Sequence, residues 1–206
     1  MNLKKTTLAV FFTAVLSAAA YADSPITSTH FGEAYMDEPI VVVVDYADGV
    51  LNSRLLEYLA SEYNPVDVKM AIINRLGWKI KGRDNAKTFL DYMIEKGGYS
   101  SEKKFFKKGR ADELISYAYL KAMDDYFNVD EALRYADQAV KKDKAGSRTI
   151  RLIAGLIKAQ KAMDSSFCDV FRITDAIRKN ERLMNDMRTK AVNKIYEYMD
   201  IYGDSC

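Results

Sequence analysis

The clearest pattern of apolar and polar positions lies between Arg110 and Ala145. In the second half of this stretch, small residues recur at steps of four and three, which places them on one face of a helix. Small residues on one stripe let a neighbouring helix approach closely, and aliphatic side chains beside them fill the seam. The pattern predicts a hairpin of two amphipathic helices. The positions that carry it are Ala132, Ala136 and Ala139, with Val129, Leu133 and Val140 beside them.

Capping residues and glycine or proline breaks divide the rest of the chain into further helix-length segments. The segment after Gly146 is apolar nearly all round, which is typical of a helix at the centre of a fold. Gly82 is expected to end the helix that starts at Pro65. The expected helices span about 52–63, 65–80, 84–97, 147–163, 164–180 and 181–202, and their inward-facing positions include Ile80, Phe167 and Met184.

The run from Ile40 to Val44 is ambiguous. Its β-branched residues favour a strand. The two acids before Pro39 and the Asp48-Gly49 pair after the run are instead the start and stop signals of a helix. Because no other segment offers a strand partner, we expect a short buried helix here.

Three alanines in expected second helices, Ala86, Ala132 and Ala176, recur 46 and 44 residues apart. This spacing predicts an all-α fold of stacked helical hairpins, an α-solenoid-like array. The alternative is an irregular helical bundle without true repeats.

Residues 111–145 resemble a tetratricopeptide-type repeat in their second helix. The first helix carries Tyr119, Leu120 and Met123 where that family has a Leu-Gly pair and an aromatic residue. Lys144 stands in place of the family's closing proline. The resemblance implies a helical-hairpin scaffold, and the longer spacing of this chain points to a divergent form of it.

Residues 1–22 have the features of a secretory signal peptide: two lysines, an apolar run from Leu8 to Leu16, and a small-x-small cleavage site that ends at Ala22. We expect the mature chain to start at Asp23 and to be exported to the periplasm or secreted. It should consist of an irregular arm at 23–38 and a single helical domain at 39–206. The apolar run is too short to span a bilayer, and no transmembrane segment is expected.

Cleavage would leave 29 of the 31 Lys and Arg residues against 29 Asp and Glu, a formal net charge of zero. This balance does not favour nucleic acid as a partner. The two cysteines, Cys168 and Cys206, favour a disulfide in an exported chain. If 164–180 and 181–202 form an antiparallel pair, residues 203–205 must fold back to bring the sulfurs together. If both segments form one long helix, only an intermolecular bond or free thiols remain.

The inventory of reactive groups is small. His30 is the only histidine, which removes most Ser-His-Asp, Cys-His and multi-histidine metal arrangements. No phosphate loop or calcium loop is present, so we expect no catalytic residue, cofactor or metal. Most carboxylate pairs lie at helix ends, where they act as caps. Asp45 and Asp48 follow a strongly apolar run and are the exception.

Two stretches are candidate partner surfaces. The segment 103–110 mixes basic and aromatic residues and suits a membrane, an anionic glycan or an acidic partner, or else a connecting helix pinned by its phenylalanines. A group of tyrosines suits either a binding groove or the seams between helices. The residues are Lys103, Lys104, Phe105, Phe106, Lys107 and Lys108, and Tyr117, Tyr119, Tyr126 and Tyr135.

By exclusion, the sequence predicts an exported, non-catalytic helical module that binds a protein or peptide, one version being an inhibitor or neutralising protein. The first alternative is an envelope hydrolase that uses paired carboxylates such as Asp45 and Asp48. The second is a salt-sensitive binder of membrane or anionic glycan through residues 103–110. The oligomeric state is left open.

Overall fold

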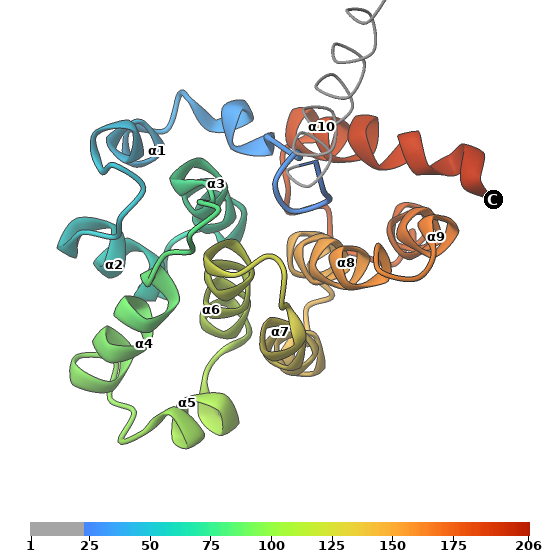
Figure 1. Cartoon of the computed structure of the whole chain (residues 1–206). Helices are drawn as coiled ribbons and strands as arrows, with labels where there is room; N and C mark the ends of the chain where they lie inside the picture. Colours follow the sequence, from blue (N-terminus) through green and yellow to red (C-terminus); the bar gives the residue numbers. More distant parts are fainter. Residues whose placement is uncertain (1–22) are drawn as a thin grey trace, which may run out of the picture.

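The computed structural model describes residues 23–206, and the predicted signal peptide lies outside the described part. Within residues 23–206 all regular structure is helical, with no β-strand (Figure 1), so the expected all-α fold class is confirmed. None of the helices in this range is both long and apolar enough to cross a membrane. The elements are η1 (Phe31–Tyr35), α1 (Pro39–Val42), η2 (Val43–Tyr46), α2 (Ser53–Ala60), α3 (Val66–Leu76), α4 (Asn85–Glu95), α5 (Glu102–Lys108), α6 (Ala111–Asp124), α7 (Asp130–Lys142), α8 (Arg148–Ala162), α9 (Phe167–Arg178), α10 (Thr189–Met199) and η3 (Asp200–Ser205), where η denotes a short 3-10 helix.

Polar side chains start several of the helices by accepting hydrogen bonds from free backbone N–H groups of the first turn. The Asn52 side chain accepts from the Leu55 N–H at the start of α2, and Ser101 accepts from the Lys104 N–H in α5. Ser147 and Ser166 cap α8 and α9 in the same way. Ser166, which caps α9, lies two residues after position 164, where this helix was expected to start.

The β-branched run after Pro39 is helical, as expected, with α1 passing directly into η2. Val41 and Val44 are buried in the core. The predicted end of α3 was wrong. The helix stops at Leu76 because Gly77 adopts a φ of 69°, a left-handed conformation that favours glycine. Ile80 therefore lies in a loop, where it is 66% exposed.

The helical hairpin predicted for 110–145 is confirmed: α6 and α7 pack against each other along their length. All three alanines of the predicted stripe are fully buried at 0% exposure. α8 contacts α3, α6, α7 and α9, so its nearly all-round apolar surface does reflect a central position. α3 and α4 both pack on α6, and Figure 1 shows this side of the molecule continuing through α2 and α1.

The proposed repeat is only partly reflected in burial. Ala86 and Ala132 are buried, as closely packed positions must be. Ala176 is exposed on α9, so the third alanine of the series faces solvent rather than a neighbouring helix. Regular stacking of the hairpins therefore stays a prediction.

The segment expected as an irregular arm consists of turns and η1, and it is part of the core. Ile26, Phe31 and Tyr35 are at most 1% exposed. η1 packs between α3 and α10, so the two ends of the described chain lie side by side (Figure 1). The last predicted helix starts at Thr189 instead of 181, and Met184 lies in the connection before it, 47% exposed.

Candidate functional site

Three connections between consecutive helices each present an exposed apolar side chain. Ile80 lies between α3 and α4, Phe127 between α6 and α7, and Phe167 at the start of α9 after the α8–α9 connection. Their exposed fractions are 66%, 59% and 51%. The inward orientation predicted for Phe167 was therefore wrong, because the helix starts only at this residue and its side chain lies at the rim.

These connections border a continuous series of hollows. The first, of about 320 Å³, lies between residues 79–82 and 124–127. The second, of about 240 Å³, shares Tyr126 and Phe127 with the first and extends to Phe167. The third is a groove of about 700 Å³ between α7, α8 and α9, and it shares Lys161 and Asp164 with the second. We call this surface, formed by residues 79–82, 124–129 and 160–173 with Leu133, Asp137 and Lys158 of the groove, the loop edge.

Aromatic stacking supports the middle of the loop edge. Tyr126 stacks on Phe127 with ring centroids 4.2 Å apart and meets Trp78 edge-on at 5.0 Å. Tyr126 is only 3% exposed, and its hydroxyl has no hydrogen-bond partner within residues 23–206. Buried polar groups without a partner are rare in folded proteins. The hydroxyl is itself enclosed, so it belongs to the interior beneath the exposed Phe127 and is not presented at the surface.

Asp124 forms the polar base of the first hollow. Its Oδ2 accepts a hydrogen bond of 2.7 Å from the Ala86 N–H, so a residue of α6 caps α4, while its Oδ1 is buried without a partner in the described chain. Burial raises the pKa of this carboxyl to about 6, and the hydrogen bonds from the Ala86 and Asn85 N–H groups oppose the shift. The raised pKa thus belongs to a structural cap.

The groove between α7 and α9 has an apolar floor and charged walls. Leu133, Ala162 and Ile173 line it together with six charged side chains of both signs. Of these six, only Lys161 is in an ion pair within residues 23–206, with Asp130 at 3.0 Å. The other five charges are free to meet a partner: Asp137, Lys158, Asp164, Asp169 and Arg172.

The tyrosines predicted as a partner surface lie inside the protein. Tyr117, Tyr119 and Tyr135 are at most 3% exposed. The rings of Tyr117 and Tyr135 are 4.4 Å apart, and the Tyr119 hydroxyl accepts a hydrogen bond from Asn74 at 2.9 Å. The groove interpretation is corrected for these three, since they fill the seams between helices. Only Tyr126 borders a hollow.

The basic-aromatic segment 103–110 is divided between core and solvent. Phe105 is fully buried, Phe106 is half-buried, and the four lysines of α5 are exposed. The phenylalanines therefore anchor the connecting helix. Arg110 is half-buried, and it donates a hydrogen bond to the Ala60 carbonyl at 2.9 Å and forms an ion pair with Asp112.

The two acids considered for a hydrolase have different structural contacts, Asp45 through its carboxylate and Asp48 through its backbone carbonyl. Asp45 forms an ion pair with Arg75. Asp48 occupies a turn at a φ of 49°, and its carbonyl accepts a hydrogen bond of 2.9 Å from Arg83. His30 borders a separate hollow of about 200 Å³ near Trp78. Within residues 23–206 no group of three or more His, Cys, Asp or Glu side chains is placed to hold a metal ion.

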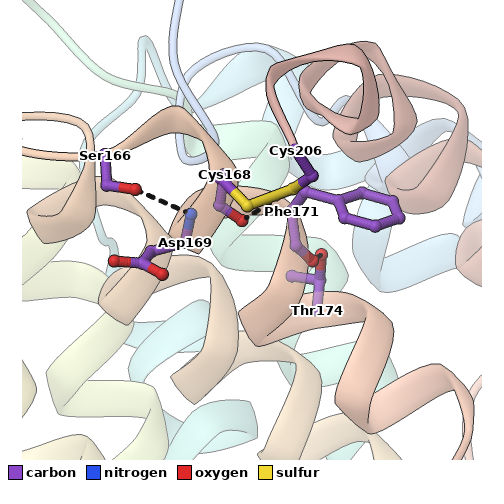
Figure 2. The surroundings of a disulfide bond; sticks show 6 residues. All are labelled: Ser166, Cys168, Asp169, Phe171, Thr174 and Cys206. Carbon is purple, nitrogen blue, oxygen red and sulfur yellow. Dashed lines mark hydrogen bonds between the residues drawn. A yellow bond between two sulfur atoms is a disulfide. The ribbon is translucent and has the colours of Figure 1, made fainter.

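The cysteines are brought together as expected. The sulfurs of Cys168 and Cys206 lie at disulfide distance within one chain, with Cα atoms 4.8 Å apart (Figure 2). Ser166 caps the same turn of α9 by accepting from the Asp169 N–H at 3.1 Å. Because α10 starts at Thr189, its continuation η3 carries the chain end to the first turn of α9.

Lys69 is a buried charged residue that the sequence pattern did not predict. Lys69 of α3 is 0% exposed, and its Nζ donates to Asp112 Oδ2 and to the Ser61 carbonyl, each at 2.6 Å. Burial lowers the pKa of this lysine, and Asp112 partly compensates. The contacts join α2, α3 and α6, so Lys69 is a structural tie.

Comparison of the chain with protein-family models, with curated proteins and with solved structures gives no match.

Proposed function

We propose that the mature chain is an exported, non-catalytic helical module that binds a protein partner through the loop edge. The observation that carries the proposal is the line of three exposed apolar side chains, Ile80, Phe127 and Phe167, along connected hollows. Aromatic and apolar anchors seated in pockets contribute most of the binding energy in protein interfaces. A small soluble protein gains nothing in stability from leaving two phenylalanines more than half exposed.

The surroundings of these anchors suit an interface. The unpaired charges of the groove form a polar rim beside the apolar positions, which is the usual anatomy of a protein interface. A partner with apolar side chains flanked by charges of both signs fits this surface. In the inhibitory version of the proposal, this chain covers the surface that the partner uses for its own binding and thereby neutralises it.

The predicted α-solenoid-like array of helical hairpins is part of this proposal. Ile80, Phe127 and Phe167 are 47 and 40 residues apart, and each lies in or directly after the turn of a pair of helices. A divergent array of hairpins would repeat such a position along one edge. Export through the signal peptide at 1–22 fits the paired cysteines and the burial of Ser24 and Ile26 directly after the expected cleavage site.

The test uses the mature chain, residues 23–206, as bait in native envelope extract, followed by an affinity measurement with the purified captured protein. A double variant, Phe127→Ala with Phe167→Ala, should bind this partner about 1,000-fold more weakly, because two interface anchors worth about 2 kcal/mol each contribute about 4 kcal/mol together. The matched control is Tyr46→Ala with Tyr63→Ala, which removes two aromatics that are 86% and 88% exposed outside the loop edge.

The control should bind as the wild type does. Equal losses in both double variants, no loss in the Phe127 and Phe167 variant, or no partner at all would each contradict the proposal. Because the substituted side chains are exposed, both variants should keep the wild-type melting temperature within a few degrees.

A further inference from the structure

A second surface lies at the other end of α6 and is purely basic. The four lysines of α5, Lys103, Lys104, Lys107 and Lys108, are all exposed. At about 100° of rotation per helical residue they project within an arc of about 140°. None of them is in an ion pair with any residue of the described chain. We call this arc the lysine face.

The opposite side of α5 is fixed to the core. Phe105 packs against Tyr99 and Tyr117 at ring distances of 5.2 and 5.8 Å, and Phe106 meets Tyr135 edge-on at 4.9 Å. Glu102 is the only acid of the helix, and it accepts a hydrogen bond of 2.8 Å from the Tyr135 hydroxyl. The helix is thereby held with its one carboxylate tied to α7 and its four ammonium groups outward.

The positive charge is concentrated in this part of a neutral chain. Residues 96–110, which connect α4 to α6 and include α5, hold six Lys and Arg against one Glu, whereas residues 23–76 hold three Lys and Arg against nine Asp and Glu. A net charge of zero for the mature protein therefore conceals a local field. Because no carboxylate of the described chain pairs with these exposed lysines, their charge is available to interact with an anionic surface.

We propose that the lysine face holds the protein on a membrane surface by contact with anionic lipid headgroups. Each lysine near an anionic bilayer contributes about fivefold in affinity, without a shaped pocket. A protein partner is the weaker fit, because lysine is depleted in protein interfaces and α5 exposes no aromatic or arginine anchor. Phe105 and Phe106 are used by the core, so the contact is made at headgroup level and is electrostatic.

This contact is independent of the loop edge. α6 runs for 14 residues between them, about 21 Å, with α5 before its first turn and Phe127 after its last. A protein on the loop edge would leave the lysine face open to lipid. The two surfaces can therefore fail or succeed separately.

The test is cosedimentation of the mature chain with vesicles of phosphatidylcholine containing about one-third phosphatidylglycerol, at about 50 mM salt. The variant replaces Lys103, Lys104, Lys107 and Lys108 by Gln. It should bind at least about 100-fold more weakly than the wild type. The control removes the same charge from four exposed lysines scattered over other helices and outside the loop edge, Lys87→Gln, Lys141→Gln, Lys179→Gln and Lys190→Gln.

The wild type and the control should bind these vesicles alike, should not bind phosphatidylcholine alone, and should be released at about 500 mM salt, where screening is strong. Absence of wild-type binding would overturn the proposal, as would an equal loss in the control. Binding of the lysine face to a poly-glutamate peptide but not to vesicles would also overturn it, in favour of an acidic protein partner. Circular dichroism of both variants should match the wild type, since no substituted α5 lysine has an internal partner.

Discussion

The α6–α7 hairpin and the junction of the two chain ends are stabilised in different ways. In the hairpin, residues close in sequence pack through small and aromatic side chains. Ala132, Ala136 and Ala139 are fully buried, and the tilted rings of Tyr117 and Tyr135 meet across the two helices at 4.4 Å. Such local, apolar contacts need little long-range organisation, and they leave a clear pattern in the sequence.

The junction, residues 23–38 with 188–206, combines buried apolar side chains such as Phe31 and Met199 with polar contacts between distant residues. The Arg188 guanidinium contacts the carboxylates of Asp37 and Glu38 and lies 4.5 Å from the ring centre of Tyr35. Lys194 pairs with Glu33 at 2.7 Å. The difference teaches that apolar contacts between residues close in sequence suffice for the hairpin, whereas the junction of the chain ends adds ion pairs and a covalent tie near the last residue to its buried side chains.

The largest expected effect breaks that tie. Cys206→Ser should lower the free energy of unfolding by about 3 kcal/mol, because a cross-link that closes a loop of 38 residues restricts the unfolded chain. Chemical or thermal unfolding of the oxidised protein measures it. Hydrogen exchange should also rise in α10 and η3 before it rises in α6 and α7.

Cys168→Ser serves as the matched variant, since it removes the same bond from the other side. The two single variants and the double variant should be equally stable. If the oxidised wild type and Cys206→Ser have the same free energy of unfolding, the disulfide does not stabilise the junction.

A smaller loss is expected from the hairpin. Ala136→Leu adds three carbon atoms at a fully buried position. Overpacking of this kind lowers the free energy of unfolding by about 1–3 kcal/mol. Lys141→Leu, on the exposed side of the same helix, should stay within about 0.5 kcal/mol of the wild type. Denaturant titration of both variants measures the difference. Equal stabilities would mean that the alanine stripe is not a close-packed seam.

The same comparison explains what the sequence could predict. Helix starts at Asn52 and Ser147 and the alanine stripe of α7 are local signals, and the structure agrees with them. The burial of residues 23–38 was not predictable in this way, because it depends on α10, about 150 residues away. Lys69 reads as a surface residue from its type alone, yet its ammonium is enclosed by Asp112 and the Ser61 carbonyl.

The loop edge was missed for a related reason. Periodicity assigns apolar residues to the core and therefore placed Ile80 and Phe167 inside helices. Their exposure follows from helix boundaries, set at Gly77 by its positive φ and at Ser166 by its side-chain cap. The sequence did contain a signal for the loop edge, since Ile80, Phe127 and Phe167 recur in or next to the connections between helices. Hydrophobic periodicity does not detect this signal, because it considers only positions within a helix.

The smallest effect concerns Asp124, the polar exception within the apolar hairpin. Its pKa is about 6 in the folded protein and about 4 in an unfolded chain, so the folded state binds the proton more tightly. The stabilisation from the protonated form is complete below about pH 4 and is lost as the pH rises through about 6. Asp124→Asn keeps an oxygen for the Ala86 N–H and carries no charge.

The variant should therefore match the wild type at about pH 3, below both pKa values, and exceed its unfolding free energy by on the order of 2–3 kcal/mol at about pH 7.5. Urea titrations at the two pH values measure this, and the remaining titrating groups cancel in the difference. Asp125→Asn removes the same charge from the exposed neighbour and should differ from the wild type by less than about 0.5 kcal/mol at both values. A difference for Asp124→Asn that does not change with pH would mean that burial does not raise the pKa of this carboxyl, and that the hairpin holds the charge of Asp124 at no cost in stability.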